Sequence, residues 1–326
     1  MDLSVVIPIY NEEESVPRLI PEIHAALRPA GLSYEIICVD DGSRDRSFAV
    51  LEEMASNDPA LVVARFRRNF GQTAAMQAGL DLARGDAVAL MDADLQNDPA
   101  DIPRMLERLD EGYDLVAGWR ADRKDAFLNR RLPSIVANRI ISRTTGVRLH
   151  DYGCTLKVMT RDVAKALRLY GEMHRFIPVV ANWSGARIFE MAVNHRARQF
   201  GVSKYGIGRT LRVVLDLLVV LFIQRYLSKP IQVFGLAGLF SGFIGFAICA
   251  VLALQKLISG ESLSDRPLLL LGVLLIIIGV QLVSMGLIAD LVARTYHESQ
   301  DKRPYAVRTL LQGPGTEAQG DPPADG

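Results

Sequence analysis

The sequence predicts an α/β protein, with a mainly parallel sheet covered by helices on both faces, then an interfacial helix and two transmembrane helices. Two observations support this fold class. In the first third of the chain, short apolar runs rich in β-branched residues alternate with amphipathic helical segments, as in parallel sheets buried on both faces. Towards the C-terminus, residues 233–258 and 268–289 are apolar stretches that each exceed the roughly 20 residues needed to cross a bilayer.

The apolar runs place the individual elements. We expect strands at residues 3–9, 34–39, 61–66, 86–91 and 114–118. The amphipathic segments between and after them predict one helix that begins near residue 14 and a second that ends near residue 55. Further helices are expected at 72–83, 100–110 and 132–145.

Composition excludes some classes of protein. The 326 residues carry 37 basic and 37 acidic side chains, so no overall basic field is expected to attract nucleic acid. The three cysteines, Cys38, Cys154 and Cys249, show neither metal-site spacing nor a disulfide framework. We therefore expect them to pack as apolar side chains.

Polar clusters follow three of the expected strands: Tyr10-Asn11-Glu12, Asp40-Asp41 and Asp92-Ala93-Asp94. Parallel sheets bind ligands at the carboxyl ends of their strands. Residues two apart in an extended segment point to one side, so Asp92 and Asp94 can face the same ligand. Close carboxylates repel unless a cation or a proton lies between them, and hard oxygen ligands suit Mg²⁺ or Mn²⁺. A single Asp-x-Asp is usually only a solvated turn, but three clusters at one edge indicate a site.

The segment at 119–131 is rich in Arg, Lys and Asp and has no apolar period. We interpret it as an active-site loop, although a solvated basic surface fits its composition nearly as well.

The charges around the two apolar stretches predict their orientation. Arginines and lysines flank the pair on its outer sides, whereas the connecting residues 259–267 contain one basic residue, Arg266. The positive-inside rule then places both termini in the cytoplasm of a multi-pass protein of the cytoplasmic (inner) membrane. Gly238, Gly242 and Gly245 permit close helix contact, from which we expect a homo-oligomer. The predicted domains are a cytoplasmic catalytic domain at 1–206, an interfacial helix within 207–230, two transmembrane helices within 231–295, and a cytoplasmic tail at 296–326 whose end is disordered.

Together the motifs resemble family 2 glycosyltransferases with the Rossmann-like GT-A fold. The matching branch is the polyisoprenyl-phosphate glycosyltransferases, which include dolichyl-phosphate mannose synthase and the bacterial enzymes that act on undecaprenyl phosphate. The resemblance covers residues 3–303, and each motif is weak alone while their order and spacing are specific. Its pieces are Pro8-Ile9-Tyr10-Asn11-Glu12, Val39-Asp40-Asp41-Gly42-Ser43, Arg68-Asn69-Phe70-Gly71-Gln72, Asp92-Ala93-Asp94-Leu95-Gln96, Asp151-Tyr152-Gly153-Cys154 and Ser203-Lys204-Tyr205.

The resemblance implies a role for each matching donor-side residue. The residues implied in nucleotide-sugar binding are Pro8, Tyr10, Glu12, Asp40, Asp41, Arg68 and Asp92. Of these, Asp40 is expected beside the base, Glu12 beside the ribose and Arg68 beside the diphosphate.

The same resemblance assigns a metal site. Asp94, which is predicted to be catalytic, is expected to coordinate Mg²⁺ or Mn²⁺ with help from Asp92 and Gln96. The ion would bridge the donor diphosphate and neutralise the charge on the leaving nucleotide. The sequence has no Gly-rich phosphate loop, so we expect the ion to supply most of that stabilisation.

A lipid monophosphate acceptor needs charge compensation more than a base, because its second pKa near roughly 6 leaves it mostly dianionic at neutral pH. The residues predicted to bind it are Arg120, Arg123, Arg131, Ser203 and Lys204, within basic segments that also contain Lys124 and Arg130. By resemblance Asp151 faces the active site as a second catalytic residue, and it either orients the acceptor or acts as base. His174, His195 and Arg198 are assigned structural or acceptor-side roles.

The predicted function is inverting, metal-dependent transfer of one sugar from a nucleoside diphosphate sugar to polyprenyl phosphate. UDP is the expected nucleotide, with GDP as the alternative. A processive polysaccharide synthase shares the same core, but its Gln-x-x-Arg-Trp motif is missing, since the only tryptophans are Trp119 and Trp183. A non-catalytic membrane scaffold or flippase is a further alternative, which the intact Asp40, Asp92 and Asp94 disfavour.

Overall fold

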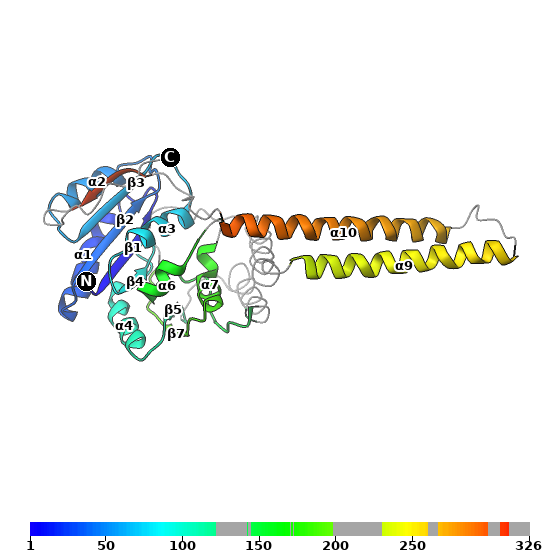
Figure 1. Ribbon diagram of the computed structural model, residues 1–326. Coiled ribbons are helices and arrows are strands. Elements are labelled where there is room, and N and C mark those ends of the chain that lie inside the picture. Colours follow the sequence, from blue (N-terminus) through cyan, green and yellow to red (C-terminus); the bar gives the residue numbers. More distant parts are fainter. Residues whose placement is uncertain are drawn as a thin grey trace. The chain divides into compact units, whose positions relative to one another are not determined.

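The computed structural model describes residues 1–121, 142, 145–169, 171, 173–197, 230–259, 267–298 and 307–312. The chain forms two compact units (Figure 1). One comprises Met1–Asp216 together with Arg303–Gly326, and the other comprises Leu217–Lys302. The expected helix at 132–145 lies almost wholly outside the described residues. Of the expected interfacial helix within 207–230, only residue 230 is described.

Within the described residues, the first unit contains an eight-stranded sheet with the order β7-β5-β6-β4-β1-β2-β3-β8. The strands are β1 (Leu3–Ile9), β2 (Tyr34–Asp40), β3 (Leu61–Phe66), β4 (Ala87–Leu90), β5 (Leu115–Trp119), β6 (Lys157–Thr160), β7 (Ile188–Ala192) and β8 (Val307–Gln312). Neighbours among β1 to β4 are parallel, as are β5 and β7, whereas β6 is antiparallel to β4 and β5. The predicted α/β class with a mainly parallel sheet is confirmed, and the five predicted strands match β1 to β5 within one residue at each end.

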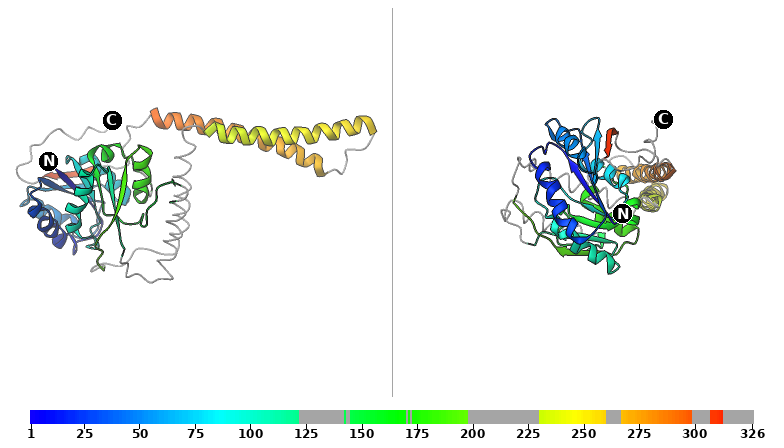
Figure 2. Two further views of the ribbon diagram at one scale, coloured as in Figure 1. Left: turned by 90° about the horizontal axis from the view of Figure 1, so that it is seen from below. Right: turned by 90° about the vertical axis from the view of Figure 1, so that its left-hand side faces the viewer.

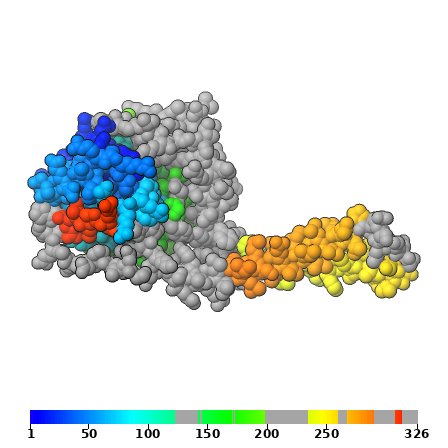
Figure 3. Space-filling view, turned by 90° about the horizontal axis from the view of Figure 1, so that it is seen from above, coloured from blue at the N-terminus to red at the C-terminus, as the bar shows by residue number. Residues whose placement is uncertain are grey.

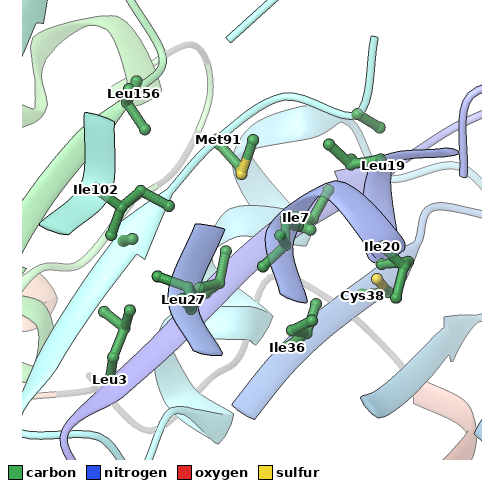
Figure 4. Packing of buried hydrophobic residues seen from close by; sticks show 14 of the residues in the cluster. Leu3, Ile7, Leu19, Ile20, Leu27, Ile36, Cys38, Met91, Ile102 and Leu156 are labelled. Carbon is green, nitrogen blue, oxygen red and sulfur yellow. The ribbon is translucent and has the colours of Figure 1, made fainter. Parts of the chain in front are cut away.

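Helices cover both faces of this sheet. They are α1 (Val16–Leu27), α2 (Ser47–Ala55), α3 (Gln72–Leu82), α4 (Ile102–Asp110), α6 (Arg161–Ala166) and α7 (Ile177–Trp183), with short 3-10 turns η1 (Arg28–Ala30), η2 (Pro99–Asp101) and η4 (Met173–Phe176). On one face, Ile7 of β1 packs with Leu19 of α1 and Ile102 of α4 in a fully buried cluster (Figure 4). On the other face, α3 approaches β1 so closely that a Cβ at Gly79 would lie 2.2 Å from Cγ1 of Val6. Successive side chains of β1 thus pack into the cores on opposite faces of the sheet.

Three strands were not predicted from the sequence: β6, β7 and β8. The C-terminal β8 pairs antiparallel with β3, with Val62 opposite Gln312 and Arg65 opposite Thr309. It lies at the surface beside segments from the first hundred residues (Figure 3, red against blue and cyan). The residues that follow the second apolar helix therefore belong to the same sheet as the residues that precede the first.

The second unit contains the two apolar helices, α9 (Pro230–Ser259) and α10 (Pro267–Glu298), which lie side by side (Figures 1 and 2). Their apolar segments, Phe234–Ile258 and Pro267–Ala289, are long enough to cross a membrane. Large apolar side chains point outwards, and Leu236, Phe243 and Leu257 are 72%, 70% and 82% exposed.

Glycines form the contact between α9 and α10. A Cβ at Gly238 would lie 2.5 Å from the carbonyl oxygen of Gly279, and a Cβ at Gly245 equally close to that of Gly272. Ser241 Oγ also donates to the carbonyl of Leu275 at 2.9 Å. The close helix contact predicted for Gly238, Gly242 and Gly245 therefore occurs within one chain, and the expected homo-oligomer stays a prediction.

Candidate active site

The turns after β1 and β2 are joined by hydrogen bonds at one edge of the sheet. The backbone amide of Asn11 donates to Ser43 Oγ at 3.0 Å, and that of Arg44 donates to Asn11 Oδ1 at 2.8 Å. The amide of Glu12 donates to Ser47 Oγ at 2.8 Å, while the Glu12 carboxylate accepts from Ser15 Oγ at 2.7 Å. Asn11 has a φ of 54°, which asparagine tolerates better than most residues. These bonds fix the Tyr10–Glu12 cluster beside the end of β2.

Asp40 is a fully buried carboxylate at the end of β2. Its Oδ1 accepts from the amide of Ser43 at 3.1 Å, and Arg65 Nε lies 3.4 Å from its Oδ2. Oδ2 accepts no hydrogen bond of normal geometry from the described residues. Burial raises the pKa of Asp40. A buried oxygen of this kind is suited to an N–H donor on a ligand.

Asp41 binds the backbone of the Arg68–Gln72 segment. Its two oxygens accept from the amides of Phe70 at 2.6 Å and Gly71 at 3.0 Å. Burial raises the pKa of Asp41 to about 6, although these two amides oppose the shift. Gly42, with a φ of 66°, allows the close approach, since a Cβ there would lie 2.6 Å from the carbonyl carbon of Arg68. The guanidinium of Arg68 lies 4.8 Å from the centre of the Phe70 ring.

Asp92 joins two parts of the site. Its Oδ1 accepts from Gln72 Nε2 at 2.7 Å, and its Oδ2 accepts from Thr155 Oγ1 at 2.6 Å. Burial, with a further contribution from the charge of Asp94, raises the pKa of Asp92 to about 6. A carboxylate whose pKa is raised by a neighbouring carboxylate is suited to share a cation with it.

Asp94 lies in a turn that the backbone holds tightly. Its Oδ1 accepts from the amide of Gln96 at 3.2 Å, and Leu95 between them has a φ of 61°, an uncommon conformation for a bulky residue. Asp94 and Leu95 are both buried. Backbone strain of this kind is concentrated at functional sites, which fits a turn that must present Asp94 and Gln96 together.

The donor set at Asp92 and Asp94 fits a small divalent cation. Within the described part of the chain, no cluster of three or more His, Cys, Asp or Glu side chains is arranged to hold a metal. Mg²⁺ typically binds one or two protein carboxylates and completes its shell with water and substrate phosphates. The two carboxylates, with Gln96 beside them, fit that pattern. They do not form a closed structural metal centre.

Arg120 and Asp151 form a second feature, at the end of β5. Arg120 Nε donates to Asp151 Oδ2 at 2.6 Å, and Nη2 donates to Oδ1 at 2.9 Å. Both side chains are mostly buried, at 15% and 4% exposure. Lys157, the first residue of β6, is also buried, and its Nζ donates to the carbonyl of Cys154. Its charge acts on both Asp92 and Asp151.

The structure therefore brings together predicted residues from the donor side and from the acceptor side. The predicted acceptor residues Arg123, Arg131, Ser203 and Lys204 lie outside the described residues, as does Arg198. His174 Nδ1 lies 2.7 Å from Thr73 Oγ1 at the start of α3, and His195 forms an isolated bridge with Asn97.

Three residues of the site were missed by the sequence analysis: Gln72, Thr155 and Lys157. Gln72 ends the Arg68–Gln72 motif, and Thr155 follows the Asp151–Cys154 motif directly, so their places in the motifs were available signals. The signal for Lys157 is a single cation at the start of an apolar run, Lys157-Val158-Met159, just after the Asp151 turn.

Comparison with known proteins identifies the family of this chain. The family model "Glycosyl transferase family 2" matches residues 4–168. The dodecaprenyl-phosphate galacturonate synthase of Rhizobium johnstonii is 46% identical over 315 residues, which cover 95% of this chain and 93% of that protein. The undecaprenyl-phosphate 4-deoxy-4-formamido-L-arabinose transferase of Edwardsiella ictaluri is 38% identical over 312 residues, which cover 95% and 94%.

Solved structures show the same fold at lower identity. The glucosyl-3-phosphoglycerate synthase of Mycobacterium tuberculosis, solved with Mn²⁺ and UDP-glucose, matches with a TM-score of 0.53 at 20% identity, over 68% of this chain and 78% of that one. The mannosyl-3-phosphoglycerate synthase of Rubrobacter xylanophilus matches with a TM-score of 0.53 at 19% identity, over 69% and 74%. The family match and the near full-length relatives show that this chain belongs to glycosyl transferase family 2 and is a glycosyltransferase.

Proposed function

We propose that the protein transfers one sugar from a nucleoside diphosphate sugar to polyprenyl phosphate, with inversion and with a divalent cation, at the cytoplasmic face of the membrane. One observation carries the proposal. The Thr155–Asp92 hydrogen bond of 2.6 Å holds the Asp151–Thr155 turn, and with it Arg120, against the carboxylate pair Asp92 and Asp94. This contact supports a cation site and an anion site next to each other, as transfer from a diphosphate to a phosphate requires.

The donor nucleotide is assigned to the ends of β1 and β2. Asp40 Oδ2 is a buried acceptor suited to the ring N–H of uracil, and guanine carries such a donor too, so UDP is proposed with GDP as the alternative. Pro8, Tyr10 and Glu12 complete this wall, with Glu12 beside the ribose. Arg68, whose guanidinium lies over the Phe70 ring, is assigned to the diphosphate.

Asp94 and Asp92, with Gln96, are the proposed ligands of Mg²⁺ or Mn²⁺. A bound cation would neutralise charge that develops on the departing diphosphate. Gln72 and Thr155 orient the Asp92 carboxylate through the two hydrogen bonds to its oxygens. Such hydrogen bonds to a metal ligand typically contribute to affinity as well as to orientation.

The acceptor phosphate is its own nucleophile. A polyprenyl phosphate is largely dianionic at neutral pH, so the protein must place it and compensate its charge rather than deprotonate it. Arg120 is the described residue assigned to this role. Arg123, Arg131, Ser203 and Lys204 are proposed to assist it.

Connectivity supports the proposed membrane topology independently of charge counts. The strands β1 to β7 precede the two apolar helices and β8 follows them, yet all belong to one sheet. Because strands on both sides of the apolar helices belong to one sheet, the segment between them must cross the membrane an even number of times. We therefore propose two crossings, by α9 and α10, with residues 260–266 outside and the sheet unit in the cytoplasm, in agreement with the positive-inside rule.

The function can be tested by transfer of a labelled sugar. Purified protein in detergent is incubated with undecaprenyl phosphate and a panel of UDP- and GDP-sugars, with Mg²⁺, with Mn²⁺, or with EDTA. The proposal predicts a labelled, organic-extractable and mild-acid-labile lipid that depends on the cation. Labelled polymer as the product would favour a polysaccharide synthase, and no product from any donor would overturn the proposal.

The topology can be tested by cysteine labelling in intact cells. After replacement of Cys38, Cys154 and Cys249, single cysteines are placed at Ser262 or at Ala324. An impermeant reagent should label the first and should leave the second unlabelled until the cells are opened. Labelling at Ala324 in intact cells would overturn the topology.

A further inference from the structure

The pair formed by Arg120 and Asp151 has a specific geometry. The guanidinium meets the carboxylate side-on, through Nε at 2.6 Å and Nη2 at 2.9 Å. A guanidinium has five N–H donors in one plane, so this arrangement engages two and leaves three, of which one on Nη1 and one on Nη2 lie side by side on the outer edge. That edge is wide enough to bind a phosphate through two parallel hydrogen bonds.

The carboxylate of Asp151 is surrounded by donors. Besides the two bonds from the guanidinium, Oδ1 accepts from the amide of Gly153 at 3.0 Å, and Oδ2 from the amide of Arg120 at 3.4 Å. The backbone amide of Asp151 is itself held by Glu190 Oε1 at 2.9 Å. The side chain is thus fixed in direction by its own turn, by β5 and by β7.

From this geometry we propose that Asp151 is a positioning residue. It holds Arg120 side-on so that the outer edge of the guanidinium is presented to the acceptor phosphate, and it does not act as a general base. The inference rests on the proposed function, because it concerns the acceptor of that reaction. It decides between the two roles that the sequence left open for Asp151.

Two neighbours support a holding role. A Cβ at Gly153 would lie 3.0 Å from Arg120 Nη2 and 3.4 Å from Asp151 Oδ1, so glycine leaves room for the pair. Lys157 donates to the carbonyl of Cys154 and fixes the far side of the same turn.

A base role fits the surroundings of Asp151 poorly. Both carboxylate oxygens of Asp151 already accept hydrogen bonds from the Arg120 guanidinium, so the carboxylate is turned towards Arg120. The acceptor phosphate, moreover, has no proton that must be removed before it attacks. The one contribution left for Asp151 is therefore the orientation of Arg120.

A double-mutant cycle tests the inference. Asp151→Asn, Arg120→Ala and the double variant are compared with the unchanged protein for the apparent KM of undecaprenyl phosphate, kcat, and the affinity for UDP with Mn²⁺ measured without acceptor. If Asp151 acts through Arg120, Asp151→Asn raises the acceptor KM about tenfold, and the double variant is no worse than Arg120→Ala alone. The affinity for UDP stays unchanged in all three, which also shows that the variants are folded.

Arg84→Ala is the matched control. Arg84 also binds a carboxylate through Nε and Nη2, which both donate to Glu35 Oε2 at 2.9 Å and 2.7 Å, but Glu35 lies near the start of β2, at the opposite edge of the sheet. This variant should change neither the apparent KM of undecaprenyl phosphate nor the affinity for UDP.

Two results would overturn the inference. One is an additive double variant. The other is an Asp151→Asn variant whose kcat falls about a thousandfold at unchanged acceptor KM, with loss of the acidic limb of the pH–rate profile, as for a base. If the unchanged protein transfers sugar to no polyprenyl phosphate, the proposed function itself fails and the inference fails with it.

Discussion

The two sides of the active site differ in how their carboxylates are paired. On the donor side, Asp40, Asp41, Asp92 and Asp94 lie at the ends of β2 and β4, and the only ion pair that the described residues offer them is the 3.4 Å contact between Asp40 and Arg65. On the acceptor side, the carboxylate of Asp151 is bound to the Arg120 guanidinium through two hydrogen bonds, and Glu190 accepts from the backbone amide of Asp151. The donor side thus gathers four carboxylates with one 3.4 Å ion-pair contact among the described residues, whereas the acceptor side pairs its Asp151 carboxylate with a guanidinium through two short hydrogen bonds.

This difference explains how one site handles two phosphate compounds. A donor diphosphate cannot approach four carboxylates unless a cation accompanies it, and burial has already raised the pKa of Asp41 and of Asp92 to about 6. An acceptor phosphate can bind Arg120 directly, because that side chain is already held in place and charged. The comparison predicts that changes on the donor side act through the cation and changes on the acceptor side do not.

The largest effect is expected for Asp94→Ala. Loss of a metal ligand removes stabilisation of the departing diphosphate that is commonly several kcal/mol, which corresponds to a fall in kcat of about a thousandfold or more. Initial rates of lipid labelling measure it, and the thermal unfolding temperature shows whether the variant is folded. Asp98→Ala, which removes a nearby carboxylate that pairs with Arg196 instead, is the control and should keep most activity. A folded Asp94→Ala protein with near-normal turnover would contradict the metal assignment.

A smaller and more selective effect is expected for Arg120→Ala. Loss of a bidentate phosphate contact should raise the apparent KM for polyprenyl phosphate about 10- to 100-fold, while the affinity for UDP with Mn²⁺ stays nearly constant. Arg120→Lys should restore only part of the loss, because lysine cannot present two parallel donors. Arg123→Ala and Arg131→Ala are expected to act in the same direction. Loss of UDP binding in these variants would show that the two substrates have been assigned to the wrong sides.

The donor side should also depend on pH through its cation. With its pKa raised to about 6 by burial and by Asp94, the Asp92 carboxyl holds a proton below that pH and must lose it to bind a metal. The affinity for Mn²⁺ should therefore fall by up to about tenfold for each pH unit below about 6, and change little above it. Titration of Mn²⁺ binding by electron paramagnetic resonance measures this dependence. Asp92→Asn should bind Mn²⁺ more weakly and lose this pH dependence, and an unchanged slope in that variant would exclude Asp92 as its source.

The donor side was also the part that the sequence predicted best. The strands β1 to β4 are mainly apolar, and Asp40, Asp92 and Asp94 lie at or just after the ends of β2 and β4, so local pattern and the parallel-sheet rule suffice to bring them to one edge. Because β4, β1 and β2 are neighbours in the sheet, the predicted clusters meet.

The acceptor side depends on pairings that no local pattern reveals. The strand β6 has four residues and starts with Lys157, while β7 contains Glu190, so neither reads as an apolar run. Without the antiparallel insertion of β6 between β4 and β5, nothing indicates that Asp151 binds Arg120, 31 residues earlier. The same holds for β8, whose pairing places Val62 opposite Gln312 although both apolar helices lie between them in the sequence.

The smallest effect is expected for Asp40→Asn, and its sign tests the comparison most finely. Burial raises the pKa of Asp40, so the ionised carboxyl is less stable in the folded protein than in the unfolded chain. For such a group the favourable contribution is present below the unfolded pKa and is lost as pH rises through the folded value. A neutral asparagine, which keeps an acceptor for the amide of Ser43, avoids that loss but gives up the contact with Arg65.

We therefore expect Asp40→Asn to leave the free energy of unfolding near pH 7 unchanged, or to raise it by about 1 kcal/mol, with the difference shrinking towards about pH 4. Thermal unfolding of the detergent-solubilised protein at several pH values measures it. A variant that is less stable near pH 7 and recovers in acid would mean that Asp40 is stabilised by Arg65 as Asp151 is by Arg120. The two sides would then share one arrangement, and the need for a cation on the donor side would rest on Asp41, Asp92 and Asp94 alone.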